Sequence, residues 1–379
     1  MAIAIAALFT LPNAAAEPPR NDERPCNHQD KASLATSIVA FQIENDLFAG
    51  TDSQYTNGVR LTWVSPNIGS LNDPLLPIWI RCSNKAIRSM FGSLVAGDVT
   101  ALNMVVTLGQ AMYTPVDRDR TTVDPGDRPY AGWLYLGLGY NIRHDPDDAH
   151  AYTTSKRLDT LEIDVGVVGP HAYAQSTQDL VHRARAIRRF EGWGNQLGDE
   201  FGVQIVREQK FRPPSLSSED PASPANAWAV QAIPHYGYSL GNIASYVNAG
   251  IEVRAGWRLP DDFGTSPIRP GGDNAAPRGP IAEKFARIYT QHSFHVFASF
   301  DTRVVANNIF LDGNTFRKSH AVKKNPLVAD VAYGFAYTFP KASWRPGGKL
   351  AYSHYLQTPE FRSEGRTHGF GSVSLSLEL

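Results

Sequence analysis

Ser372-Val373-Ser374-Leu375-Ser376-Leu377-Glu378-Leu379 is the stretch that decides the fold, because polar and apolar side chains alternate along it without a break. A period of two is typical of a β-strand with one apolar and one polar face. A strand of this kind needs only about 9–11 residues to cross a membrane in a barrel, so average hydropathy stays low. The chain ends inside this predicted strand.

The composition fits an exported all-β protein better than a cytosolic enzyme. The 379 residues include 31 Gly, 15 Tyr, 18 Phe and 7 Trp, and the formal net charge is −1. Beyond the N-terminal segment, no stretch approaches the roughly 20 apolar residues that a membrane helix needs. A transmembrane barrel stays compatible with this pattern, since only alternate side chains of its strands face lipid.

Alternating segments bounded by Pro, Gly, Asn and Asp recur along the chain and are candidate strands. They are residues 36–45, 55–65, 101–110, 132–143, 158–168, 198–210, 226–238, 243–258, 287–301, 303–318, 327–339, 347–358 and 368–379. A closed bacterial barrel has an even number of strands, so one of these candidates is expected to be spurious or split. The prediction is a transmembrane antiparallel β-barrel of about 12 strands, with a short helix in an external loop.

Aromatic residues near the ends of these segments suit the girdles that barrels place at the two membrane interfaces. They suit the core of a soluble β-sandwich as well, so they favour a membrane location only mildly. The residues are Trp63, Tyr113, Trp133, Tyr135, Trp228, Tyr236, Tyr238 and Trp257.

The chain is predicted to contain a signal peptide and one folded domain. Residues 1–16 are apolar and end in the small-residue cleavage pattern Asn13-Ala14-Ala15-Ala16, although a basic start is missing. An ordinary buried segment is the alternative. Residues 17–35 would form a periplasmic N-terminal segment and 36–379 a single barrel, with 212–225 and 260–280 as long loops.

The two cysteines, Cys26 and Cys82, are compatible with one disulfide in an oxidising periplasm. Two unpaired thiols are the alternative.

Two polar stretches stand at the ends of predicted strands, namely 44–58 and 166–182. An even-stranded barrel keeps both termini in the periplasm, so its odd-numbered strands run outward and both stretches converge on the cell-surface rim. Residues 170–189 become helical in character. Gln175, Gln178 and His182 are spaced i, i+3 and i+7, which places them on one helix face that could look down on Asn45 and Asp46.

These residues support a limited chemistry. Asn45, Asp46 and the backbone carbonyls around Thr56 and Gly58 are hard oxygen donors suited to calcium. His182 is the natural general base, because an unperturbed histidine pKa near 6.5 allows it to take a proton from water. A cation beside it would hold an oxyanion, so ester hydrolysis is possible without a protein nucleophile.

Each element also has a simpler interpretation. An Asn-Asp pair at a strand end and the segment 55–58 can both be turn chemistry alone. A histidine on a polar helix face is usually solvated.

Together, the motifs resemble those of the outer-membrane lipid A 3′-O-deacylases of the LpxR type. The resemblance spans about residues 36–200. The motifs are Ile43-Glu44-Asn45-Asp46, Asp52 to Gly58, Leu108-Gly109-Gln110 with Tyr113-Thr114-Pro115, Gly166 to Pro170, Gln178 with His182, and Gly192-Trp193-Gly194-Asn195-Gln196.

The resemblance implies a twelve-stranded barrel that needs calcium and releases the 3′-linked acyloxyacyl group of lipid A in the outer leaflet. His182 would activate water, with Gln178 supporting it from one helical turn before. Asn45 and Asp46 would lie in the calcium and oxyanion region, lined by Thr56 and Gly58.

The chain departs from the family pattern in one place. The family can place an acid soon after the histidine, whereas this chain has Arg188 there. Glu191 is the nearest carboxylate and the remaining candidate metal ligand.

The resemblance also implies partners. Lipid A or lipopolysaccharide would be the substrate, the protein would be a monomer in the outer membrane, and nucleic acid is not expected as a partner. Arg183, Arg185, Arg188 and Arg189 are either a charged surface or contacts for lipopolysaccharide phosphates.

Two alternatives belong to other classes. A non-catalytic barrel would be a pore or a surface-binding protein, but about 12 strands give a narrow lumen, whereas porins with water channels use about 16–18. An outer-membrane phospholipase would need a serine nucleophile, and no serine stands in a recognisable triad context.

Overall fold

The computed structural model describes residues 37–46, 54–68, 78, 81–82, 99–146, 150, 153–218, 228–265, 289 and 291–379, with no description of the side chains of 54–56. The predicted signal peptide and periplasmic segment, 1–16 and 17–35, lie outside these ranges. Cys82 is disulfide-bonded, and Cys26 lies outside the described residues.

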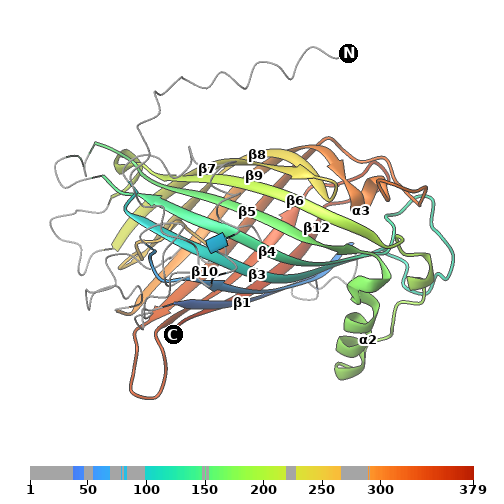
Figure 1. The fold of residues 1–379 in the computed structure, drawn as a ribbon, viewed down its shortest axis with the longest axis horizontal. Helices are drawn as coiled ribbons and strands as arrows, with labels where there is room; N and C mark the ends of the chain where they lie inside the picture. Colours follow the sequence, from blue (N-terminus) through green and yellow to red (C-terminus); the bar gives the residue numbers. More distant parts are fainter. Residues whose placement is uncertain are drawn as a thin grey trace, which may run out of the picture.

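Twelve antiparallel strands form a closed barrel in which β12 pairs with β1 (Figure 1). The strands are β1 (Ile38–Asn45), β2 (Gln54–Val64), β3 (Ala101–Thr114), β4 (Ala131–His144), β5 (Lys156–Val168), β6 (Glu200–Arg212), β7 (Trp228–Gly241), β8 (Ala244–Trp257), β9 (Ser293–Asn308), β10 (Leu327–Phe339), β11 (Gly348–Gln357) and β12 (His368–Glu378). The predicted barrel is confirmed, and every strand pairs with its neighbour in sequence.

The thirteenth predicted strand came from splitting β9. The candidates 287–301 and 303–318 are one strand, Ser293–Asn308, followed by the short helix α3 (Ile309–Asp312). The apparent break fell at Asp301, which is buried inside the barrel and lies 2.5 Å from His235 Nε2. A charged residue on the inner face of a strand therefore resembled a turn.

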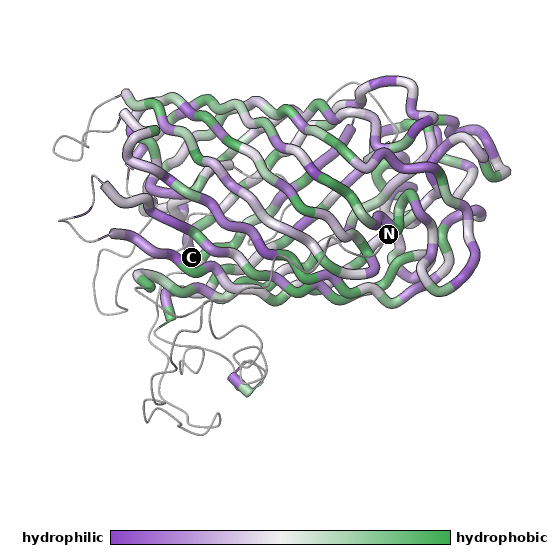
Figure 2. Tube along the Cα trace, turned by 90° about the horizontal axis from the view of Figure 1, so that it is seen from above, coloured by the Kyte–Doolittle hydropathy of each residue, from purple (hydrophilic) through white to green (hydrophobic). Residues whose placement is uncertain are grey.

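The two faces of the barrel wall differ in polarity, as the alternating colours along the strands show in Figure 2. Buried ion pairs cross the interior, such as Arg60 Nη2 to Glu162 Oε1 at 2.8 Å. The outer wall is apolar, which suits contact with lipid acyl chains. Its exposed residues include Phe41, Leu61, Leu108, Leu136, Val165, Val230, Val253, Val296, Phe300, Val331, Leu350 and Leu375. In the described part of the chain, no helix is both long and apolar enough to span a membrane.

Three of the aromatic residues assigned to membrane girdles face inward instead. Tyr113, Trp133 and Tyr135 line a cavity inside the barrel, whereas Trp228 is 71% exposed. Glycines make room for the inward rings, because a Cβ at Gly109 would collide with the Tyr135 ring and a Cβ at Gly202 with Trp133. The girdle prediction is wrong for these three residues.

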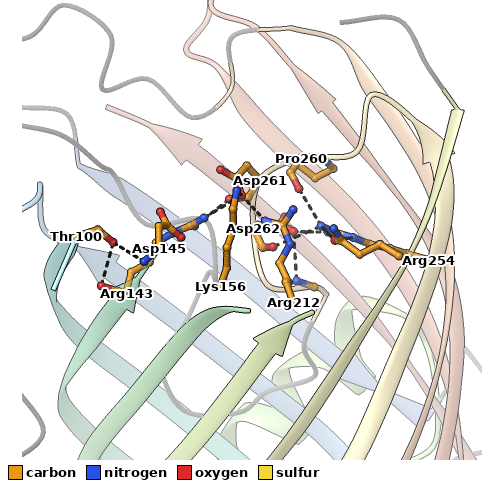
Figure 3. A network of polar contacts seen from close by, with 11 residues as sticks. Thr100, Arg143, Asp145, Lys156, Arg212, Arg254, Pro260, Asp261 and Asp262 are labelled. Carbon is orange, nitrogen blue, oxygen red and sulfur yellow. Dashed lines mark hydrogen bonds and ion pairs between the residues drawn. The ribbon is translucent and has the colours of Figure 1, made fainter. Parts of the chain in front are cut away.

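A folded-back segment fills the interior at the end of the barrel that holds the C-terminus. Residues 258–265 follow β8, and Asp262 and Phe263 are 0% and 1% exposed. Figure 3 shows Asp261 and Asp262 among basic side chains from the surrounding strands. Arg143 Nη2 and Lys156 Nζ lie 2.8 and 3.3 Å from Asp261 Oδ1.

The same segment makes further ion pairs around the barrel. Arg212 also pairs with Asp261, Arg254 pairs with Asp262, and Lys349 Nζ lies 3.0 Å from Asp262 Oδ2. These cations and those of the preceding contacts come from β4, β5, β6, β8 and β11, so the network joins strands around the circumference.

Candidate active site

Both polar stretches lie at the end of the barrel opposite the C-terminus. Ile38 pairs with Glu378 at one end of β1, and Asn45 pairs with Gly371 at the other. Val168, the last residue of β5, pairs with Glu200 of β6 and Trp133 of β4, beside which η3 (Pro170–Ala172) begins. The strand-parity argument therefore placed the two stretches at one end correctly.

Helix α2 (Ala174–Ala184) packs against the outside of the wall at this end (Figure 1). Gly132 faces outward, since its neighbour Trp133 lines the interior. A Cβ on Gly132 would lie 2.5 Å from Ala174 Cβ, so only glycine permits this approach. Gln110 Nε2 donates to the Ala172 carbonyl oxygen at 2.6 Å and secures the start of the helix.

Asn45 is on the outer wall, on the same side as α2. Glu44 lines the interior cavity, so its neighbour Asn45 points outward. Asn45 is directly opposite Asn57 of β2, and Asn57 is directly opposite Met112 of β3. Met112 packs with Ala174, among the buried residues beneath the helix. The sheet register thus connects the Asn45 region with α2.

For the other predicted site residues of the stretch 44–58, the structure gives burial or strand pairing. Asp46 follows β1 and is fully buried. Thr56 lies at an irregularity of β2, where the pairing with β3 shifts between Tyr55 and Asn57. Gly58 is opposite Glu44. Asp52 lies outside the described residues.

Two predicted site residues are on the buried face of α2. Ala174, Gln178 and His182 are the buried residues of the helix, spaced i, i+4 and i+8. Gln175 is exposed, so its predicted place on this face is wrong. The face follows i+4 spacing because the helix meets the wall at Ala174, which neighbours Gly132.

The orientation of the His182 ring is fixed by the backbone. His182 is 2% exposed, and its Nδ1 lies 2.7 Å from the Arg188 carbonyl oxygen. A carbonyl oxygen can only accept, so Nδ1 carries the proton and a neutral ring has its lone pair on Nε2. The Phe190 ring packs beside it, with centroids 5.8 Å apart.

Gln178 is held by Trp193, a contact that the sequence did not reveal. Trp193 Nε1 donates to Gln178 Oε1 at 2.7 Å, and both side chains are buried. This contact settles which end of the amide is nitrogen, because indole can only donate. Gln178 Nε2 is buried and has no hydrogen-bond partner among the described residues. The glycine-rich motif around Trp193 was the signal available in the sequence.

Tyr130 completes the support of Trp193. The two rings lie 5.0 Å apart between centroids, and burial raises the pKa of Tyr130 to about 12. Tyr130 therefore stays protonated at neutral pH.

Arg188 and Glu191 both present their side chains to the surface. Arg188 Nη1 lies 3.2 Å from Asp119 Oδ1. Glu191 is exposed, and its backbone N–H donates to the Arg118 carbonyl oxygen at 2.9 Å. No described contact joins Glu191 to Asn45 or Asp46.

The donors around Asn45 suit a hard cation. Within the described ranges, no group of three or more His, Cys, Asp or Glu is arranged to hold a metal ion. Asn57, however, is 7% exposed, and its Oδ1 has no hydrogen-bond partner among the described residues. A buried amide oxygen opposite Asn45 is the kind of ligand that calcium accepts. Asn57 was not singled out from the sequence.

The cavity inside the barrel is separate from the candidate active site. It measures about 230 Å³ and is lined by charged and aromatic side chains, including Glu44, Arg60 and Asp330. Neither Gln178 nor His182 borders it. The candidate active site therefore lies on the lipid side of the wall.

A solved structure has a similar architecture. The LpxR from Salmonella typhimurium has a similar fold, with a TM-score of 0.62 and 18% sequence identity over 90% of this chain and 99% of that chain. An outer-membrane channel from Pseudomonas putida F1 matches at a TM-score of 0.35 and 8% identity, over 94% of this chain and 99% of that chain. No match was found among the curated proteins.

The sequence itself matches the family described as outer membrane protein LpxR over residues 1–379. This protein is therefore a member of the LpxR family of outer-membrane proteins.

Proposed function

We propose that this protein is a calcium-dependent hydrolase that removes the 3′-linked acyloxyacyl group from lipid A in the outer leaflet. Family membership supports a lipid A deacylase. The observation that carries the proposal is the position of His182, which lies on the buried face of α2, on the outer side of the barrel wall. A substrate embedded in the membrane can reach this site laterally.

His182 acts as the general base. Its Nδ1–H donates to the Arg188 carbonyl, so Nε2 is the ring atom with the lone pair that takes a proton from water. The resulting hydroxide attacks the ester carbonyl, and the protonated ring later returns the proton to the departing sugar oxygen. The products are the acyloxyacyl carboxylic acid, which keeps its secondary acyl ester, and the 3′-hydroxyl of the sugar. Positioned proton transfer of this kind contributes roughly 10²- to 10⁴-fold to the rate.

Gln178 donates from its amide nitrogen to the oxyanion that forms during this attack. The support is the fixed amide orientation, since Trp193 occupies Oε1 and Nε2 is the buried donor without a described partner. Gln178 stands one helical turn before His182, so both groups address the same volume. Trp193 is a positioning residue, because it acts through Gln178.

Calcium would be held by oxygens of Asn45, Asp46 and Asn57, together with backbone carbonyls near Thr56 and Gly58. When bound, it supplies positive charge that stabilises the developing oxyanion. The side chain of Glu191 is exposed and would have to turn inward to join this ligand set.

A pore is the competing function, and the folded-back segment argues against it. Asp261 and Asp262 bind basic side chains from five strands across one end of the barrel interior. A water-filled path would have to break this network.

Mass spectrometry of lipid A from membranes of a host that expresses the protein tests the proposal. A mass loss of one acyloxyacyl group that needs both calcium and intact His182 is the expected result. Unchanged lipid A with a folded, membrane-inserted protein would contradict it. Loss of acyl chains from glycerophospholipids alone would instead identify a phospholipase.

A further inference from the structure

The segment that ends α2 is strongly basic. It carries Arg183, Arg185, Arg188 and Arg189 within seven residues, with no carboxylate between them. All four side chains are exposed. The segment adjoins the proposed base, since Arg183 follows His182 directly in the sequence and the Arg188 carbonyl oxygen contacts the His182 ring.

The four arginines are not equivalent. Arg188 faces Asp119, with its Nη1 3.2 Å from Oδ1, and Arg189 Nη1 lies 3.9 Å from Asp179 Oδ2. Among the described residues, neither Arg183 nor Arg185 has a carboxylate partner. Arg183 Nε donates to the Asp179 backbone oxygen at 3.2 Å, which anchors the side chain and leaves its two terminal nitrogens for a ligand.

The outward face of α2 suits the boundary between lipid headgroups and acyl chains. Tyr173 and Leu180 are 59% and 61% exposed, and Leu180 and Arg183 are spaced i, i+3 on one side of the helix. Apolar side chains next to exposed arginines are typical of helices that lie in this boundary. In helices of this kind the arginines lie at the depth of lipid phosphates, which suits Arg183 and Arg185.

The chemical structure of lipid A indicates which of its phosphate groups the arginines would bind. In lipid A, the scissile ester is on the 3′ carbon, and the neighbouring 4′ carbon carries a phosphate. An ester placed at His182 brings that phosphate to the adjacent helix end. Guanidinium groups bind phosphate through paired, charge-assisted hydrogen bonds.

We propose that Arg183 and Arg185 bind the 4′-phosphate of lipid A and select substrates that carry it. This inference rests on the proposed function, because it assumes that the ester at His182 belongs to lipid A.

Hydrolysis by the purified, folded protein in mixed micelles tests the selection. The substrates are bisphosphorylated lipid A and lipid A that lacks only the 4′-phosphate. Removing the phosphate should lower kcat/KM of the unmodified protein about 10- to 30-fold. The double variant Arg183→Ala/Arg185→Ala should show the same loss on bisphosphorylated lipid A and no further loss without the phosphate. Two independent, additive losses would overturn the proposal.

Arg189→Ala is the matched control, because it removes one exposed arginine of the same segment that already has a carboxylate neighbour, with Nη1 3.9 Å from Asp179 Oδ2. Its kcat/KM should change less than about twofold. A loss equal to that of the double variant would mean general attraction to anionic micelles, which also overturns the proposal. Circular dichroism in micelles checks that each variant is folded.

A binding experiment tests the phosphate site independently of the proposed hydrolysis. Micelles containing either lipid A are titrated with the His182→Ala protein, which does not need to turn over. Tighter binding that requires both the 4′-phosphate and the arginine pair supports the site even if no ester is cleaved. Equal binding of both lipids by the His182→Ala protein, together with hydrolysis of lipid A by the unmodified protein, would reject the site and retain the enzyme.

Discussion

The Nδ1 atom of His182 lies 2.7 Å from the backbone carbonyl oxygen of Arg188. The acceptor is main chain, so the identity of the side chain at position 188 does not affect the ring orientation. An arginine can therefore stand at position 188 without disturbing the histidine. The Arg188 side chain points instead towards Asp119 at the surface.

Replacing His182 with alanine should abolish lipid A hydrolysis, because no other described side chain at the helix face can take a proton from water. Thr56→Ala should slow the reaction less. Mass spectrometry of lipid A measures turnover, and heat-modifiable migration confirms a folded barrel. Activity equal to that of the unmodified protein would remove His182 from the mechanism.

Trp193→Phe should lower kcat about 5- to 10-fold and leave KM nearly unchanged. The phenyl ring keeps most of the packing with Tyr130 but loses the donor that orients the Gln178 amide. A Gln178→Met variant removes the amide and should be at least as slow. If Trp193→Phe keeps full kcat while Gln178→Met does not, the indole has no positioning role.

Asn57→Leu should raise the calcium concentration for half-maximal activity by about tenfold. Asp46→Asn should raise the same concentration more than any other single substitution at the proposed ligands. The reason for the effect of Asn57→Leu is the buried Asn57 oxygen on the same face as Asn45. Titration of activity with calcium after chelation measures both. Unchanged titrations for both variants would place the metal elsewhere.

Glu360 and Arg128 form an ion pair between two loops at the site end of the barrel. Burial raises the pKa of the Glu360 carboxyl, but Arg128 and other cations outweigh it, so the pKa lies below its ordinary value of 4.5. The pair therefore stabilises the fold above pH 4.5, and this contribution is lost as the pH falls through the lower folded-state pKa.

Glu360→Gln should accordingly lower the free energy of unfolding by about 3 kcal/mol at pH 7, since it removes the carboxylate that balances the buried Arg128 guanidinium. Thermal unfolding in micelles should show this difference shrinking in strong acid. A gap that stays constant down to the lowest measurable pH would mean that the loss is not due to the carboxylate charge.

Alternating side chains and strand parity predicted the barrel and the end at which the site lies, because both depend on local periodicity. The outward direction of Asn45 could not be predicted, since it depends on the register of β1 against β2 and β12. The Trp193 contact with Gln178 joins residues outside any common periodic element. The prediction that Tyr135 belongs to an aromatic girdle is wrong because Gly109, far away in the sequence, makes room for the Tyr135 ring inside the barrel.

The buried position of Asp262 has a consequence for the cell that makes this protein. A site that works on the outside of the barrel needs no solute to pass through the interior, and the ion-pair network closes one end of that interior. High expression should therefore leave the envelope impermeable to large antibiotics such as vancomycin. Under the proposed function, the protein would act on lipid A without opening a path through its own barrel.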